Sequence, residues 1–165
     1  MKKIILSSFL IFLFSMPMIA STGKLSLWGD ISVPKTKCVE GFDFGFQTKT
    51  QENTGYQLAL IGLSENVTGT QVGIIYACSK KIQGAQGGLV VHANEIKGYQ
   101  AGFVTYSQNL TGFQYGCINI SREIKGMQLG LVNYASTMNK GIQIGLVNII
   151  RNSSLPVMVI ANAKF

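Results

Sequence analysis

The sequence predicts an all-β protein, and specifically a β-solenoid of about eight repeats of 14–15 residues. Two observations predict this fold. Glycine returns at a nearly fixed spacing along most of the chain, and polar and apolar residues alternate within each repeat, which is typical of a strand and not of a helix. The composition agrees, because 19 glycines against 3 prolines in 165 residues favour regular backbone over a flexible linker.

Two glycine columns define the repeat. The first glycine recurs in steps of 14 or 15 residues: Gly41, Gly55, Gly69, Gly84, Gly98, Gly112, Gly126 and Gly141. Four residues later, seven of the eight repeats carry a second glycine, at Gly45, Gly73, Gly88, Gly102, Gly116, Gly130 and Gly145. Only Ala59 departs from this column. Together the two columns contain 15 of the 19 glycines, which excludes a chance arrangement.

Amide side chains recur between and after the glycines. A glutamine lies midway between the two glycine positions in seven repeats: Gln57, Gln71, Gln86, Gln100, Gln114, Gln128 and Gln143. Asp43 takes this place in the first repeat. Asparagine follows the first glycine by seven residues in the last three repeats, as Asn119, Asn133 and Asn148. We interpret all these residues as architecture, and expect no ligand role for them.

Strand alternation places glycine, glutamine and glycine on one face of each repeat and three apolar side chains on the other. In a parallel solenoid, equivalent residues stack about 4.8 Å apart, amides form ladders, and each coil buries its apolar face against its neighbours. The alternative is a small antiparallel outer-membrane-type β-barrel or meander, in which the apolar face contacts lipid. The even period of 14–15 residues favours the solenoid, because a barrel with unequal ends would repeat every 28 residues.

The two ends of the chain differ from the repeat region, 41–154. Residues 1–20 have the pattern of a secretory signal peptide, with Lys2 and Lys3 before an apolar run. Residues 21–40 contain one alternating segment, which we expect to form a single strand that caps the first repeat. Residues 155–165 alternate again and end on an aromatic residue, so we expect a closing strand there.

The unit Gly-x-Gln-x-Gly-Leu-x-Asn, present as GMQLGLVN and GIQIGLVN, resembles the repeat of a family of predicted bacterial surface proteins. The resemblance covers residues 41–165 and implies an exported protein of the cell surface, with no assigned activity. The core Gln-x-Gly-x-x-Asn is also similar to the repeat of curli amyloid subunits. That second resemblance implies self-assembly, although the curli unit is longer and has polar positions that this chain lacks.

No constellation of residues predicts catalysis, and we expect no enzyme. His92 is the single histidine, the seven acidic residues form no recurrent pair, and Cys38, Cys78 and Cys117 lack the spacing of a metal site. Basic residues are scattered singly except for Lys80-Lys81, which argues against nucleic-acid binding. We therefore expect no catalytic, metal or cofactor site.

These observations favour a non-catalytic exported module, structural, adhesive or scaffolding, at the bacterial cell surface or in the periplasm. The expected partners are a second copy of the chain or a component of the cell envelope. A small outer-membrane barrel and a curli-like self-assembling subunit are the alternatives.

Overall fold

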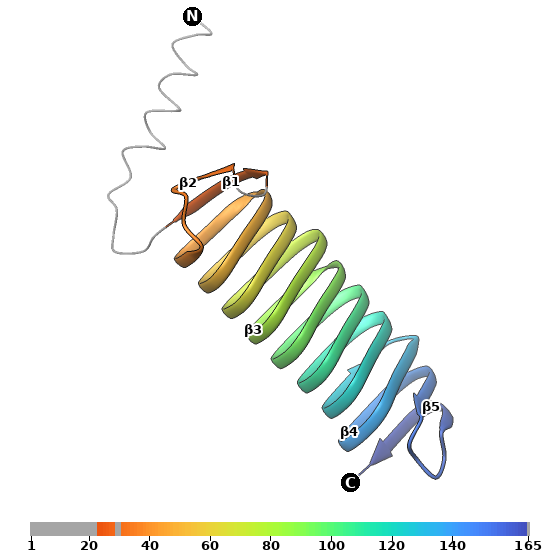
Figure 1. Ribbon diagram of the computed structural model, residues 1–165. Helices are drawn as coiled ribbons and strands as arrows, with labels where there is room; N and C mark the ends of the chain where they lie inside the picture. Colours follow the sequence, from red (N-terminus) through yellow and green to blue (C-terminus); the bar gives the residue numbers. More distant parts are fainter. Residues whose placement is uncertain (1–22, 29–30, 165) are drawn as a thin grey trace, which may run out of the picture.

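The computed structural model describes residues 23–28 and 31–164 and confirms the predicted fold class. The chain is an all-β solenoid of about eight coils, wound along a single axis with the two ends of the chain at opposite ends of the stack (Figure 1). The predicted signal peptide, residues 1–20, and the terminal Phe165 lie outside the described residues.

Five strands form one sheet in the order β2-β1-β3-β4-β5. β1 (Lys24–Trp28) and β2 (Ile31–Val33) cover the N-terminal end, and β5 (Val157–Lys164) covers the C-terminal end. β3 (Cys38–Leu129) and β4 (Val132–Ile150) wind through the coils between them. β3 runs for 92 residues, because the coils bend without interrupting the hydrogen bonding between neighbours.

Successive coils lie parallel and in register. Between β3 and β4, Asn119 pairs with Asn133, Gly126 with Gly141, and Gln128 with the glutamine of the next coil. We number the coils 1 to 8 by their first glycines: Gly41, Gly55, Gly69, Gly84, Gly98, Gly112, Gly126 and Gly141. Parallel stacking of equivalent residues is the solenoid arrangement, so the antiparallel barrel is not the fold of this chain.

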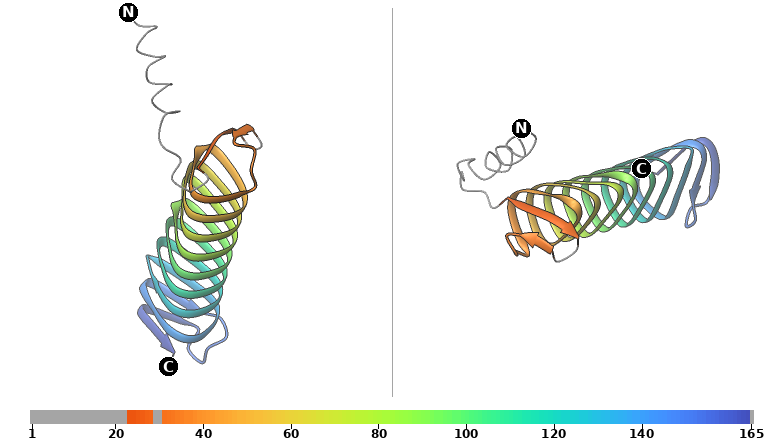
Figure 2. Two further views of the ribbon diagram at one scale, coloured as in Figure 1. Left: turned by 90° about the vertical axis from the view of Figure 1, so that its left-hand side faces the viewer. Right: turned by 90° about the horizontal axis from the view of Figure 1, so that it is seen from above.

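The N-terminal cap differs from the expected single strand. β1 lies parallel to coil 1, with Leu25 opposite Phe44, and β2 folds back antiparallel onto β1, with Val33 opposite Leu25. Folding back covers the free edge of β1, which would otherwise present unpaired backbone groups. At the other end β5 lies antiparallel on β4, with Asn162 opposite Gln143. The views in Figure 2 show both caps at the ends of the stack.

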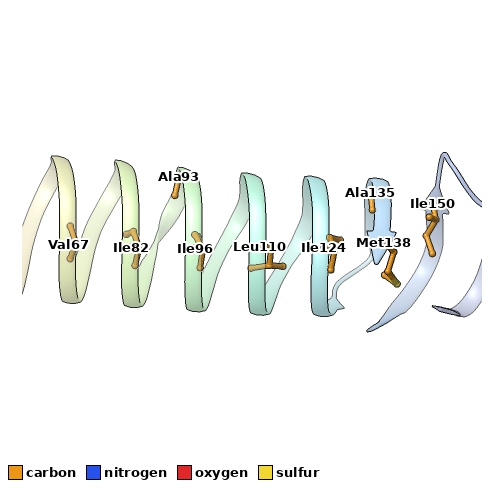
Figure 3. Packing of buried hydrophobic residues seen from close by; sticks show 9 residues of the cluster. All are labelled: Val67, Ile82, Ala93, Ile96, Leu110, Ile124, Ala135, Met138 and Ile150. Atoms are coloured by element: carbon orange, nitrogen blue, oxygen red, sulfur yellow. The ribbon is translucent and has the colours of Figure 1, made fainter. Parts of the chain in front are cut away.

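A single file of apolar side chains runs through the interior, one from each central coil (Figure 3): Val67, Ile82, Ile96, Leu110, Ile124 and Met138. Each lies two residues before the next first glycine, except Met138, which lies three before. The register shift after Ile124 absorbs the extra residue of that 15-residue repeat. The interior is therefore periodic even where the sequence spacing is not.

The side of the strand that faces inward is the opposite of the one expected. The glutamines are buried, whereas the apolar residues between the glycines point outward, and Phe42 and Tyr99 are each 65% exposed. The reason is parity: backbones approach so closely that glycine must face inward, and residues two apart share one side of a strand. The glutamine between two inward glycines must then face inward as well.

Candidate functional site

The glutamine column forms one continuous ladder inside the solenoid. Each side-chain Nε2 donates to the Oε1 of the preceding glutamine at 2.6–2.9 Å, from Gln71, Gln86, Gln100, Gln114, Gln128 and Gln143. Gln57 ends the series by donating to Asp43 Oδ2 at 2.8 Å. All seven glutamines are buried, and the ladder satisfies amides that would be costly if left unpaired.

The ladder is polar from end to end, because every amide N–H points toward the N-terminal cap. The carboxylate of Asp43 lies at this electropositive end, and Lys24 of β1 is its neighbour in register. Burial raises the pKa of Asp43, while the hydrogen bond from Gln57 and the charge of Lys24 act against that rise. At the C-terminal end, Gln143 Oε1 accepts no hydrogen bond from the described residues.

A second amide ladder runs in the opposite direction over the last coils. Thr105 Oγ1 donates to Asn119 Oδ1 at 2.7 Å, Asn119 Nδ2 to Asn133 Oδ1 at 2.8 Å, and Asn133 Nδ2 to Asn148 Oδ1 at 2.8 Å. The donors here point toward the C-terminus, so the dipoles of the two ladders oppose each other. Sequence analysis places these asparagines in one column, and they lie in one column in the structure.

A column of small hydroxyls supports the glutamines, and sequence analysis did not identify it. Ser64, Ser79 and Ser121 each donate to the Oε1 of a glutamine in the same coil at 2.7–2.9 Å. The signal was available in the sequence, because Thr50, Ser64, Ser79, Ser107 and Ser121 all follow the first glycine by nine or ten residues. Each glutamine Oε1 in those coils thus accepts two hydrogen bonds.

The glycine columns have two separate structural roles. Every first glycine has a positive φ, between 119° and 151°, and a Cβ at Gly98 would overlap the carbonyl oxygen of Gly84. A Cβ at the second-column Gly130 would overlap the side-chain amide of Asn119. The first column therefore allows the backbone conformation, and the second makes room for the asparagine ladder.

Cys78 and His92 form the closest approach to a catalytic pair in the part of the chain that the structure describes. They lie in neighbouring coils, with Cys78 Sγ 3.9 Å from His92 Nδ1, and Tyr106 packs edge-on against the imidazole. Among the described residues no carboxylate contacts the imidazole to orient it, and neither residue lines a described cavity. The pair thus lacks the third group and the substrate space that nucleophilic catalysis requires.

Over residues 23–28 and 31–164, no three His, Cys, Asp or Glu side chains come together in a way that could hold a metal ion. No helix in the same residues is long and apolar enough to cross a membrane.

A basic cleft of about 570 Å³ lies beside the N-terminal cap. Lys24, Lys35, Lys37 and Lys49 line it together with Glu65. Lys24 Nζ donates to the carbonyl oxygen of Lys49 at 2.6 Å, so one of the four ammonium groups is engaged within the protein. The cleft has a positive character, but it occupies one end of the molecule alone.

The largest surface feature is an apolar face that runs the length of the solenoid. It comprises the outward side chains one, three and five residues after each first glycine. The first column is Phe42, Tyr56, Thr70, Ala85, Tyr99, Phe113, Met127 and Ile142. The middle column is Phe44, Leu58, Val72, Gly87, Ala101, Tyr115, Leu129 and Ile144. The outer column is Phe46, Leu60, Ile74, Leu89, Phe103, Cys117, Leu131 and Leu146.

Side chains of the apolar face are in contact along the stack. Phe42 and Tyr56 stack with ring centroids 5.3 Å apart, and Tyr99 and Phe113 lie at 6.4 Å. Even so, Phe103 remains 57% exposed and Leu146 63% exposed. An exposed apolar surface of this length is typical of an interaction site.

Charged side chains gather on a different edge. All nine charged residues between positions 55 and 149 lie one, three or four residues before the next first glycine: Glu65, Lys80, Lys81, Glu95, Lys97, Arg122, Glu123, Lys125 and Lys140. Two ion pairs form along this charged edge, Lys80 with Glu65 at 3.1 Å and Lys81 with Glu95 at 3.5 Å. The exterior is thus divided lengthwise into a charged edge and an apolar face.

Comparison of the chain with protein-family models, with curated proteins and with solved structures finds no match.

Proposed function

We propose that this protein is a non-catalytic exported module of the bacterial cell surface or periplasm, with a structural, adhesive or scaffolding role. The observation that carries the proposal is the apolar face, which runs through all eight coils and includes large exposed side chains such as Phe42, Tyr99 and Leu146. Such a surface is unfavourable in water unless another molecule covers it. The protein is therefore built to associate along its length.

The interior supports the same proposal. The buried ladders fix each coil against its neighbours and fill the space in which a substrate could otherwise lie. A stiff rod with one apolar face can hold partners at fixed spacing. The predicted signal peptide at 1–20 and the resemblance to surface-repeat proteins supply the export and the location.

End-to-end assembly of the curli type receives less support from the structure. β2 and β5, the outermost strands at the two ends, each lie antiparallel to their neighbours. A polymer that continued the solenoid would need parallel, in-register ends. Association through the side of the solenoid has no such obstacle.

Cell fractionation combined with protease treatment of intact cells tests the proposal. The expected result is a chain shortened by about 20 residues and recovered from the envelope or periplasmic fraction. Leu10→Arg together with Leu13→Arg interrupts the apolar run of the leader and should leave the full-length chain in the cytoplasm. Lys80→Arg is the matched control and should be exported normally. A full-length wild-type chain in the cytoplasm would contradict the proposal.

A further inference from the structure

The apolar face has the dimensions of a stable protein interface. Eight coils at a spacing of about 4.8 Å give a length of about 38 Å, and three outward columns with their side chains give a width of roughly 20 Å. The resulting area, on the order of 750 Å², is close to the ~800 Å² that each partner contributes to a standard interface. A hollow of about 240 Å³ between the columns near coils 1–3 shows that the surface is uneven.

Large and small side chains alternate in blocks of two coils along this face. Aromatic residues occupy coils 1 and 2 and again coils 5 and 6, where the stacked pairs Phe42–Tyr56 and Tyr99–Phe113 form two ridges. Coils 3, 4, 7 and 8 contribute no aromatic side chain to the face. The lowest point lies in coil 4, where Ala85 and Gly87 are the outward residues.

We infer that the apolar face is a self-complementary interface, and that the protein forms a two-fold symmetric dimer with antiparallel solenoid axes. A two-fold axis parallel to the strands, between coils 4 and 5, places coil 1 over coil 8, coil 2 over coil 7, and so on. Each column then faces the same column of the second copy. Every ridge faces a block without aromatic residues.

The pairing is complementary in each column. Tyr99 lies over Ala85 of the second copy in the first column, and Tyr115 lies over Val72 in the middle column. In the outer column Phe46 lies over Leu146. No aromatic side chain of the face meets another aromatic across the interface, and Leu25 of β1 lies over Ala161 of β5 at the ends.

Other arrangements of two copies lose this fit. With solenoid axes parallel and coil over coil, Phe44 faces Phe44 and Gly87 faces Gly87, so the copies touch at the ridges and leave voids between them. Voids forfeit the dispersion contacts that make an interface stable. A lipid surface would accept apolar side chains in any order, so the ordered blocks favour a solid partner of matching shape. The charged edge remains in water in the antiparallel dimer.

The dimer deepens the proposed structural role by naming the partner, but it depends on the shape of the face alone and not on where the protein is located. Sedimentation velocity of the purified protein at micromolar concentration should therefore show a dimer, whatever the outcome of fractionation. A wild-type monomer, or a monomer that binds lipid vesicles instead, would overturn the inference.

Ala101→Glu tests the centre of the face. Ala101 is exposed, so the substitution is compatible with the fold, but it buries a carboxylate opposite Gly87 of the second copy. The Kd of the dimer should rise by at least about 100-fold. Asn109→Glu adds the same charge on the charged edge and should leave the dimer intact. Equal dimerisation of the two variants would refute the interface.

Thiol cross-linking tests the register without weakening the interface. Native Cys117 in coil 6 lies over Ile74 in coil 3 of the second copy, so Ile74→Cys brings two pairs of thiols together across the dimer. A short bis-maleimide should then give a covalent dimer on a denaturing gel. Leu146→Cys places an exposed thiol in the same column far from Cys117 of the second copy and should give little. Equal yields from both variants would exclude the antiparallel register.

Discussion

Removal of Gln100 should be among the most damaging single changes to the solenoid. Gln100 lies at the middle of the interior ladder and is fully buried. Its Nε2 donates to Gln86 Oε1 at 2.9 Å and to the carbonyl oxygen of Tyr106 at 3.1 Å, and its Oε1 accepts from Gln114 Nε2 at 2.8 Å. Gln100→Ala breaks all three hydrogen bonds at once.

The magnitude follows from the groups left behind. Gln86 Oε1 and Gln114 Nε2 would each lose the hydrogen bond from or to Gln100 while remaining buried. An unsatisfied buried polar group costs about 1–3 kcal/mol, so two of them lower the free energy of unfolding by about 2–6 kcal/mol. Gln108→Ala, on the charged edge and exposed, should change it by less than about 0.5 kcal/mol.

Gln100→Glu separates the loss of a donor from the loss of volume. An ionised carboxylate can accept from Gln114 but offers no proton to Gln86 Oε1, whereas the protonated acid offers one. Burial should raise its pKa in the folded state, so the variant should gain stability relative to wild type as the pH falls through that folded pKa. Urea denaturation followed by circular dichroism at pH 4 and pH 7 measures both effects. If Gln100→Ala unfolds as late as Gln108→Ala, the ladder is not what stabilises the interior.

Three further changes test other parts of the structure. Because burial raises the pKa of Asp43 above 3.8, its stabilising contribution is present below that unfolded value and is lost as the pH rises through the folded pKa; denaturation at several pH values should show this slope in wild type and not in Asp43→Asn. Gly98→Ala forces a Cβ against a backbone carbonyl and should cost at least about 2 kcal/mol, whereas Gly87→Ala, in open space, should cost less than about 1 kcal/mol. Ile124→Ala empties one position of the apolar file and should cost about 2–5 kcal/mol, a range that thermal denaturation can check.

The repeat spacing was sufficient to predict the coil and its register. Glycine at 14–15-residue steps fixes the length of one coil, and glutamine at a constant offset requires that equivalent residues stack. The ladders followed, because amides stacked about 4.8 Å apart can both donate and accept. The fold and the ladder could therefore be predicted from local pattern alone.

The direction of the faces could not be predicted by assuming that apolar residues point inward. That assumption fails here because the close approach of backbones at Gly84 and Gly98 decides the inward side before hydrophobicity does. The double strand at the N-terminal cap was missed for a related reason. Alternation marks Leu25 and Val33 as strand residues but does not show that one folds back on the other.

A polar interior changes what the hydrophobic residues of this chain are for. Hydrophobic residues make up 47% of the sequence, yet the buried apolar side chains of the solenoid form little more than one file through the coils. The coils are held by backbone hydrogen bonds and by ladders that leave few interior polar groups unpaired. Side chains such as Tyr99 and Phe103 therefore contribute to the single solenoid only through their contacts along the stack. Their full stabilising effect is obtained when the face is covered, so association, more than folding, explains the apolar character of this sequence.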